Sequence, residues 1–176
     1  MKNDYVKVLL YAYPSLPRIA EAVGTGAENK AFLSFRAYGS AFGIAERVVE
    51  EILVKNNLER VYCALREAVS RCTDQEKFLL EYKYFRRKRE LKDCDESALS
   101  ERTYYRRQQR LLKKIAEQLA AQDWTEENCK ELFDSFAPFR KLYAALCAGR
   151  ERQLTLARKR REVRFKRAGA PKENGA

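Results

Sequence analysis

Glycine and proline are scarce in this chain, and their scarcity is the feature that most constrains its fold. The 176 residues include seven glycines and four prolines, so long stretches lack the residues that turn or break the backbone. In the longest periodic stretch, Ser40–Arg71, apolar residues recur at intervals of mostly three and four: Ile44, Val48, Ile52, Leu58, Val61, Leu65 and Val69. This is the period of a helix with one buried face. No segment alternates apolar and polar residues as a strand does, so we predict an all-α, multi-helix bundle.

Turn and capping residues set the predicted helix boundaries. The first helices are predicted over residues 3–13 (ended by Pro14), Arg18–Val23 (closed by Gly24 and Gly26) and Ala27–Tyr38, and Asn56-Asn57 is expected to break or bend the 40–71 segment. A capping-box sequence, Thr73–Glu76, predicts the next helix start. Later helices are predicted from Ser100 to Ala121, from Thr125 to Phe136, and from Phe139 through Gly149 to about Arg161.

Positive charge is concentrated in two segments. The formal net charge is +11, and residues 82–114 and 149–176 each carry +7, which leaves −3 for the rest of the chain. A weakly acidic body with two basic segments indicates directed attraction to a polyanion. Double-stranded DNA fits this pattern better than an anionic membrane, because neither segment has a wide apolar face beside its charge. A solvated protein surface is the alternative interpretation.

Enzyme, metal and cofactor chemistry are not expected. The chain has no histidine, and its five cysteines stand singly at 63, 72, 94, 129 and 147. We interpret them as small, half-buried residues in a reducing compartment. No glycine-rich phosphate loop or nucleophile elbow is present. Asp4 and Lys7 argue against a signal peptide, and no apolar run approaches the roughly 20 residues that span a membrane, so we expect a cytoplasmic location.

The segment Thr73–Leu119 carries the functional prediction. A capped helix, a short charged helix or turn and a second capped helix beginning at Ser100 follow the order of a helix-turn-helix. Five residues are predicted to face inward on the second helix: Tyr104, Leu111, Leu112, Ile115 and Leu119. Arginine suits guanine edges, glutamine adenine edges, and tyrosine phosphate or thymine methyl groups. We therefore predict base reading by Arg102, Tyr105, Arg106 and Gln109, and phosphate contacts by Ser100, Thr103, Arg107, Arg110, Lys113 and Lys114.

This segment resembles the promoter-binding helix-turn-helix of sigma factors (region 4). The spacing of that family is found here in Tyr84-Phe85, followed after thirteen further residues by Leu99-Ser100. The sequence from Ser100 to Arg106 is closer still to that of ArpU-like phage transcriptional regulators. The resemblance covers about residues 73–121. It implies transcription regulation on duplex DNA, with RNA polymerase as a further partner.

The chain departs from the family in the supporting helix. Asp93 and Glu96 stand where sigma-like domains place apolar residues, although Cys94 matches the small residue expected there. The departure implies a supporting helix that is shifted, shortened or replaced by a loop.

The basic end of the chain, Ala157–Arg167, leaves three interpretations open. It is a helix or arm laid along phosphates, a solubilising tail, or a partner helix with the partial amphipathicity of Leu154, Leu156, Val163 and Phe165.

Together these patterns predict four regions. They are an N-terminal helical supporting or oligomerisation region (1–72), a DNA-binding helix-turn-helix region (73–121), C-terminal helices with a basic end (122–167) and a disordered tail (168–176). Part of the 40–71 segment is a candidate homodimer surface, since DNA readers commonly pair two half-sites. The predicted function is a non-catalytic, phage- or mobile-element-type transcriptional regulator. The alternative is a protein–protein interaction or phage assembly module that does not bind DNA.

Overall fold

The computed structural model describes residues 3–34, 41–85 and 101–168, and these residues form helices and short connections without a strand. The predicted all-α class is confirmed. The first part of the chain forms α1 (Asp4–Ala12), the 3-10 turn η1 (Tyr13–Ser15), α2 (Leu16–Ser34) and α3 (Ala41–Ser70). It is followed by α4 (Asp74–Leu80) and the π-helical turn η2 (Glu81–Phe85). The last three elements are α5 (Glu101–Ala120), α6 (Glu126–Ser135) and α7 (Ala137–Ala168).

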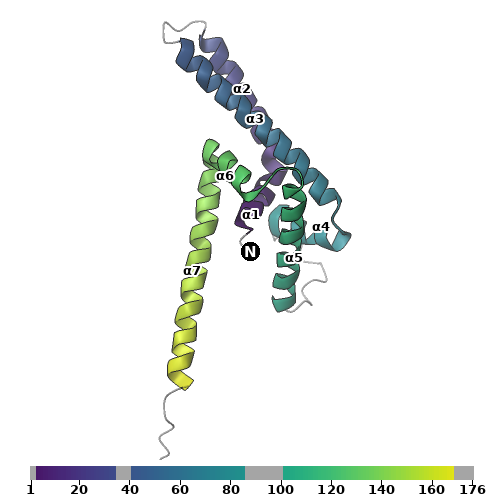
Figure 1. Cartoon of the computed structure of the whole chain (residues 1–176), viewed down its shortest axis with the longest axis vertical. Coiled ribbons are helices and arrows are strands. Elements are labelled where there is room, and N and C mark those ends of the chain that lie inside the picture. The colour runs from purple at the N-terminus through teal and green to yellow at the C-terminus, as the bar shows by residue number, and fades with distance from the viewer. Residues whose placement is uncertain (1–2, 35–40, 86–100, 169–176) are drawn as a thin grey trace, which may run out of the picture.

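The first helix, α1, lies at the centre of the molecule (Figure 1). Its side chains are buried on nearly every side: Tyr5, Val6, Val8, Leu9, Leu10 and Ala12. A helix that is apolar all round is stable only when other elements enclose it, and α5, α6, α7 and η2 all contact α1. One continuous cluster of buried residues joins these elements to α3. The three predicted regions 1–72, 73–121 and 122–167 therefore share one core.

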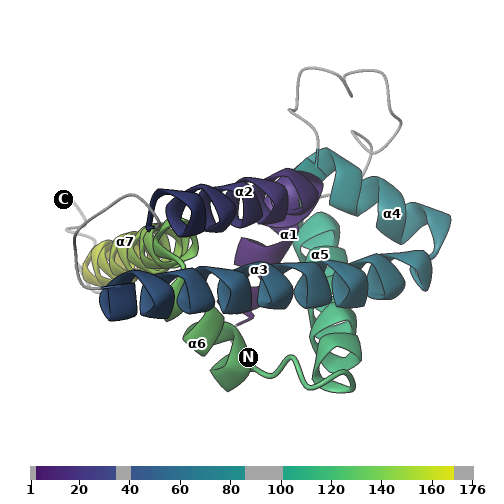
Figure 2. The same ribbon diagram turned by 90° about the horizontal axis from the view of Figure 1, so that it is seen from above.

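The helices α2 and α3 form a long antiparallel hairpin that extends away from this core (Figures 1 and 2). The prediction that Gly24 and Gly26 end a helix is wrong, because α2 continues through both to Ser34. Each glycine costs a helix about 1 kcal/mol relative to alanine, and packing along α3 offsets that cost. Gly24 also permits a close approach, since a Cβ atom there would lie 3.0 Å from Cδ of Lys55. The predicted end of a helix at Tyr38 falls outside the described residues.

The expected break at Asn56-Asn57 is also wrong, because α3 is one helix of 30 residues. Packing on both sides of the pair outweighs the weak helix propensity of asparagine. Leu58 is fully buried and Val54 packs against the core. The predicted apolar stripe of α3 is buried only in its C-terminal half: Ile52 is 44% exposed, whereas Leu58, Val61 and Leu65 have no exposed surface.

The capping box that begins α4 is confirmed. Oγ1 of Thr73 accepts a hydrogen bond from the Glu76 N–H at 3.4 Å, and Oε2 of Glu76 accepts one from the Thr73 N–H at 2.9 Å. These reciprocal bonds satisfy two backbone donors that a helix start leaves unpaired. The start of α4 is thereby fixed ahead of η2.

The remaining helix starts are close to the predicted ones. Thr125 caps α6 by accepting from the Asn128 N–H at 3.3 Å, and α6 ends before Pro138 as predicted. α7 begins at Ala137, two residues earlier than predicted, and continues past Gly149 and Arg161 to Ala168. Ser100, the predicted cap of α5, and the supporting-helix positions Asp93, Cys94 and Glu96 lie outside the described residues.

Candidate nucleic-acid interface

α5 has one face in the core and one in solvent. Four apolar side chains predicted to point inward are buried against the body: Leu111, Leu112, Ile115 and Leu119. Tyr104, also predicted inward, is half-buried, and its ring centroid lies 6.4 Å from that of Tyr82. The buried residues recur every three or four positions, which is the pattern of a helix with a single core-facing stripe. The other side of α5 is therefore directed outward.

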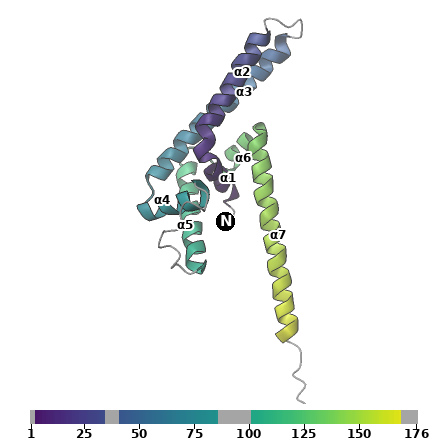
Figure 3. The same cartoon turned by 180° about the vertical axis from the view of Figure 1, so that it is seen from behind.

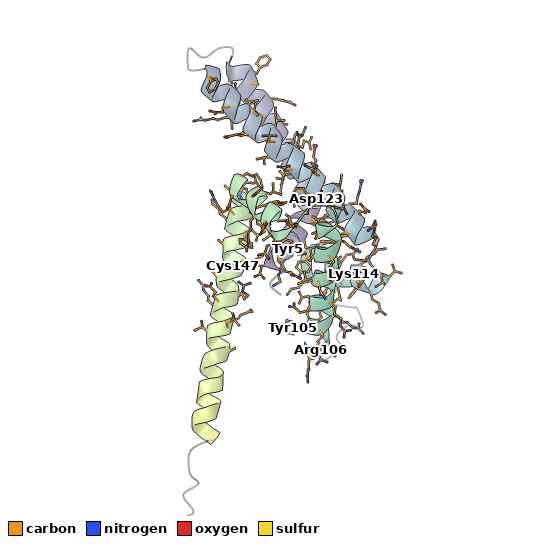
Figure 4. All side chains as sticks on the ribbon, viewed as in Figure 1. Tyr5, Tyr105, Arg106, Lys114, Asp123 and Cys147 are labelled. Carbon is orange, nitrogen blue, oxygen red and sulfur yellow. The ribbon has the colours of Figure 1, made fainter. Side chains whose placement is uncertain are left out.

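The four residues predicted to read bases lie on this outward side. Arg102, Tyr105, Arg106 and Gln109 are all exposed. Their spacing of three, one and three residues places them on neighbouring positions of the first turns of the helix. Figure 4 shows Tyr105 and Arg106 near the N-terminal end of α5, where their side chains project from the body. We call this end the free end of α5. The structure thus brings the four together on one exposed surface, which we call the outward face of α5.

The residues predicted to contact phosphates are less uniform. Arg110 and Lys113 are exposed, Thr103 and Arg107 are half-buried, and Ser100 lies outside the described residues. Lys113 is 3.6 Å from the carboxylate of Glu117, and both side chains are more than 60% exposed. Exposed pairs of this kind contribute only about 0–1 kcal/mol, so Lys113 can exchange Glu117 for a phosphate.

Lys114 has a different environment from the other predicted phosphate contacts. Its Nζ donates a hydrogen bond to Oε2 of Glu76 at 2.6 Å. Burial raises the pKa of Glu76, but the hydrogen bonds with Lys114 and Thr73 outweigh burial and hold the pKa below its ordinary 4.5. The same hydrogen bond raises the pKa of Lys114. Lys114 therefore ties α5 to the capping box of α4, and it would have to leave Glu76 to reach a phosphate.

A buried hydrogen bond sets the position of the outward face. Nε2 of Gln108 donates to the hydroxyl oxygen of Tyr84 at 2.9 Å, and both residues are less than 9% exposed. Burial raises the pKa of the Tyr84 hydroxyl, and the Tyr84 ring meets that of Tyr11 edge-on at 4.9 Å. This contact joins η2, α5 and α1. Gln108 is not among the predicted site residues, although its place three residues before Leu111 puts it on the inward stripe.

The second basic segment belongs to α7. The first half of this helix packs on α6 and α1, and Arg150 forms an ion pair with the buried carboxylate of Asp4. Beyond Arg150, the described side chains 151–157 are exposed, with Leu154 at 54% and Leu156 at 56%. From both front and back, α7 and the free end of α5 extend toward the same side of the molecule (Figures 1 and 3). The outward face of α5 is not covered by the C-terminal helices.

The described residues offer little chemistry besides charge. They contain no group of three or more histidine, cysteine, aspartate or glutamate residues placed to hold a metal ion. Cys72 and Cys129 are buried, Cys147 is half-buried and Cys63 is exposed. Of these four cysteines, only Cys147 is half-buried as predicted. Burial raises the pKa of Cys129 to about 12 and also raises that of Cys72. Both thiols stay protonated at neutral pH.

The predicted helix-turn-helix is described only in part, because residues 86–100 between η2 and α5 lie outside the described residues. Within the described ranges, no helix is long and apolar enough to cross a lipid bilayer. No protein-family model, no curated protein and no solved structure matches this chain. What remains to assign a function is the geometry of α5 and the charge around it.

Proposed function

We propose that this chain is a non-catalytic DNA-binding protein that reads duplex DNA with the outward face of α5, in the manner of a phage- or mobile-element-type transcriptional regulator. One observation carries the proposal. Arg102, Tyr105, Arg106 and Gln109 are exposed together in the N-terminal half of α5, whereas the leucines of the helix are buried. An α-helix about 10–12 Å across fits the major groove of B-DNA, which is about 12 Å wide.

The chemistry of these side chains suits the edges of bases. Arg102 and Arg106 each carry a planar guanidinium that can donate two parallel hydrogen bonds to guanine O6 and N7. Gln109 can pair in the same bidentate way with adenine N6 and N7. Tyr105 can contact a phosphate or a thymine methyl group. Arg107, Arg110 and Lys113 then lie within reach of the flanking phosphates and set the register of the helix.

Electrostatic attraction supplies most of the affinity in this proposal. Residues 82–114 and 149–176 each carry +7 on a chain whose remainder carries −3. Each phosphate that such a protein neutralises releases condensed counterions, so affinity falls steeply with salt. The direction shared by α7 and the free end of α5 is consistent with both basic segments meeting one polyanion (Figure 3).

The proposal is tested by fluorescence anisotropy on a pool of random-sequence duplexes across a salt series. We expect binding with a log–log salt slope of several units. In Arg102→Ala/Arg106→Ala the slope should fall by up to about two, because two cationic contacts are lost. The matched control is Arg140→Ala/Lys141→Ala, which removes the same charge from exposed positions at the start of α7. It should bind like the unchanged chain.

Base reading is tested separately on duplexes selected from the pool. Gln109→Ala should relax the preference at one base pair by about 1–3 kcal/mol, whereas Arg110→Ala should weaken binding to all sequences alike. A chain truncated after Gly149 measures the share of the basic C-terminal segment. Loss of binding only on truncation would move the DNA contact from α5 to α7. No binding at low salt would overturn the proposal and favour an interaction module whose basic helix meets an acidic protein.

A further inference from the structure

The α2–α3 hairpin exposes apolar surface that the proposed DNA contact does not use. Of the large apolar side chains that are exposed among the described residues, six lie in its distal half: Phe32, Leu33, Phe42, Val49, Ile52 and Leu53. Phe42 is 78% exposed, more than any other of them. The hairpin extends from the core on the side opposite the free end of α5 (Figure 1). Exposed apolar side chains gathered in one part of a molecule are typical of an interaction site.

Two of the exposed apolar residues of α3, Val49 and Leu53, lie on the side that faces away from α2. Glu51 forms an ion pair with Lys30 of α2, and the side chain of Lys55 lies against Gly24 of α2. Val49 and Leu53 each stand two positions from these contacts, which is about 200° around a helix. They are 55% and 57% exposed. We call the line of residues Phe42, Val49, Leu53 and Arg60 the outer stripe of α3.

The outer stripe leads into a hollow beside α6. The hollow has a volume of about 660 Å³ and is lined by residues of α3, of the α5–α6 connection and of α6. Leu53 belongs to both the stripe and the hollow, and Arg60 at the far end lies with its guanidinium carbon 6.0 Å from the centre of the Trp124 ring. Leu132 adds a second apolar wall. The rest of the lining is mostly polar and includes the carboxylates of Glu50, Asp123 and Glu131. An aromatic side chain entering beside Leu53 and Arg60 would meet apolar surface and a cation.

The spacing of the outer stripe is symmetric. Its four residues are separated by seven, four and seven positions. An antiparallel copy of α3 can therefore lie on it in one register in which each stripe residue faces a stripe residue of the other copy. In that register Val49 of each copy meets Leu53 of the other, and Phe42 meets Arg60 beside Trp124. A guanidinium on an aromatic face is attractive by about 0.5–2 kcal/mol. Each contact occurs twice and the interface closes on itself, as a two-fold interface must.

The exposed apolar side chains of α3 supply about half of the area that a stable dimer needs. Phe42, Val49, Ile52 and Leu53 are 44–78% exposed, and each offers roughly 100 Å² of apolar surface. Their sum of about 400 Å² is half of the about 800 Å² that each partner buries in a standard interface. Protein interfaces are about 56–58% nonpolar, so the hollow and the polar flanks of α3 can supply the rest.

We propose that the outer stripe of α3 is a homodimer interface in which two copies of this chain pair antiparallel, with Phe42 of each copy entering the hollow of the other. The proposal is independent of DNA binding, because the outward face of α5 contributes nothing to it.

The first test is the molar mass of the DNA-free protein by light scattering coupled to size-exclusion chromatography. At micromolar concentration we expect twice the 20.6 kDa of one chain. Val49→Glu/Leu53→Glu places four like charges at the centre of the interface and should return the mass to that of a single chain. Leu154→Glu, which changes a leucine of similar exposure on α7, should remain dimeric. Circular dichroism checks that each variant keeps its helix content.

The second test fixes the register. Phe42 and Arg60 are 18 residues apart on one helix, about 27 Å along its axis, so cysteines at these positions cannot bond within one chain. With the exposed Cys63 replaced by serine in every variant, Phe42→Cys/Arg60→Cys should form a covalent dimer on mild oxidation, in higher yield than either single variant. A monomeric unchanged chain would overturn the proposal, and so would a dimer indifferent to Val49→Glu/Leu53→Glu. Equal cross-linking by the single variants would reject the register.

Discussion

At the scale of single residues, the orientation of α5 depends on polar contacts hidden beneath its outward face. The buried hydrogen bond between Gln108 and Tyr84 joins α5 to η2, and the bond between Lys114 and Glu76 joins α5 to α4 nearer the surface. A binding surface works only if its side chains are held in place by such supporting contacts. α5 therefore carries both the residues proposed to touch DNA and two residues, Gln108 and Lys114, that hold the helix in place.

Tyr84→Phe isolates this supporting role. The substitution keeps the ring and removes the hydroxyl oxygen that accepts from the Gln108 amide, which stays buried. Leaving a buried donor unpaired costs about 1–3 kcal/mol, so we expect the free energy of unfolding in urea to fall by that amount. Tyr84→Phe/Gln108→Leu removes both partners and should recover part of the loss. Tyr105→Phe, at an exposed tyrosine of α5, should unfold like the unchanged chain. A loss below about 0.5 kcal/mol in Tyr84→Phe would contradict the supporting role.

The residues of the outward face could be predicted because they obey a local rule. Helical period separates Arg102, Arg106 and Gln109 from the buried leucines of α5. Tyr105 stands seven residues before the buried Leu112, on nearly the same side of the helix, and is nevertheless 53% exposed. The pairing of Lys114 with Glu76 could not be predicted in this way, since the two lie 38 residues apart and only the packing of α4 on α5 brings them together. Gln108 was open to prediction from its position, but its partner Tyr84 was not.

At the scale of elements, helix starts were predicted better than helix ends. The caps at Thr73 and Thr125 act through bonds to residues three positions on, so the sequence carries the full signal. Gly24 and Asn56-Asn57 weaken a helix by local propensity, and the contact between α2 and α3 overrides that preference. Whether such a residue ends a helix depends on a partner helix that local sequence does not reveal.

α7 shows how one ion pair holds a long element to the core. Asp4 at the start of α1 pairs with Arg150 and, at 2.9 Å, with Lys7, and its side chain is only 6% exposed. Arg150 stands midway along α7, where the packed half of the helix gives way to the exposed residues 151–157. The pair therefore fixes the point from which the basic end extends.

Arg150→Ala should loosen this attachment. Asp4 would keep Lys7 but lose its second partner while remaining buried, so we expect a loss of about 1–3 kcal/mol in unfolding free energy. Hydrogen exchange should rise in the middle of α7. Asp4→Asn in the same chain removes the underpaired charge and should restore part of the stability. Arg152→Ala, an exposed arginine two residues away, is the control. Equal effects of Arg150→Ala and Arg152→Ala would show that the ion pair does not anchor α7.

At the scale of the whole molecule, α1 is the centre around which the other elements of the core pack. The first helix is enclosed by η2, α5, α6 and α7, which come from the later parts of the sequence. Its apolar character was visible in the sequence, but its central place was not, because periodicity says which side of a helix is buried and not by what. The hairpin and α7 are the parts that extend beyond this core (Figure 1).

The two proposals separate association from DNA contact in space. The outer stripe of α3 lies in the hairpin, and the outward face of α5 lies at the other side of the core (Figure 1). Pairing through the hairpins would leave both α5 faces open. A two-fold protein dimer reads a two-fold DNA site, because each copy meets the same base sequence in opposite orientation.

Selection from a random duplex pool tests this combined arrangement. If both proposals hold, the unchanged chain should enrich an inverted repeat of two half-sites. Val49→Glu/Leu53→Glu should enrich a single half-site and bind the full repeat more weakly, because the second contact is no longer linked to the first. Leu154→Glu should enrich the same repeat as the unchanged chain. Enrichment of one unrepeated site by a chain that is dimeric in solution would show that the dimer presents only one α5 to DNA. Enrichment of a repeat by the Val49→Glu/Leu53→Glu chain would instead show that pairing on DNA does not use the outer stripe.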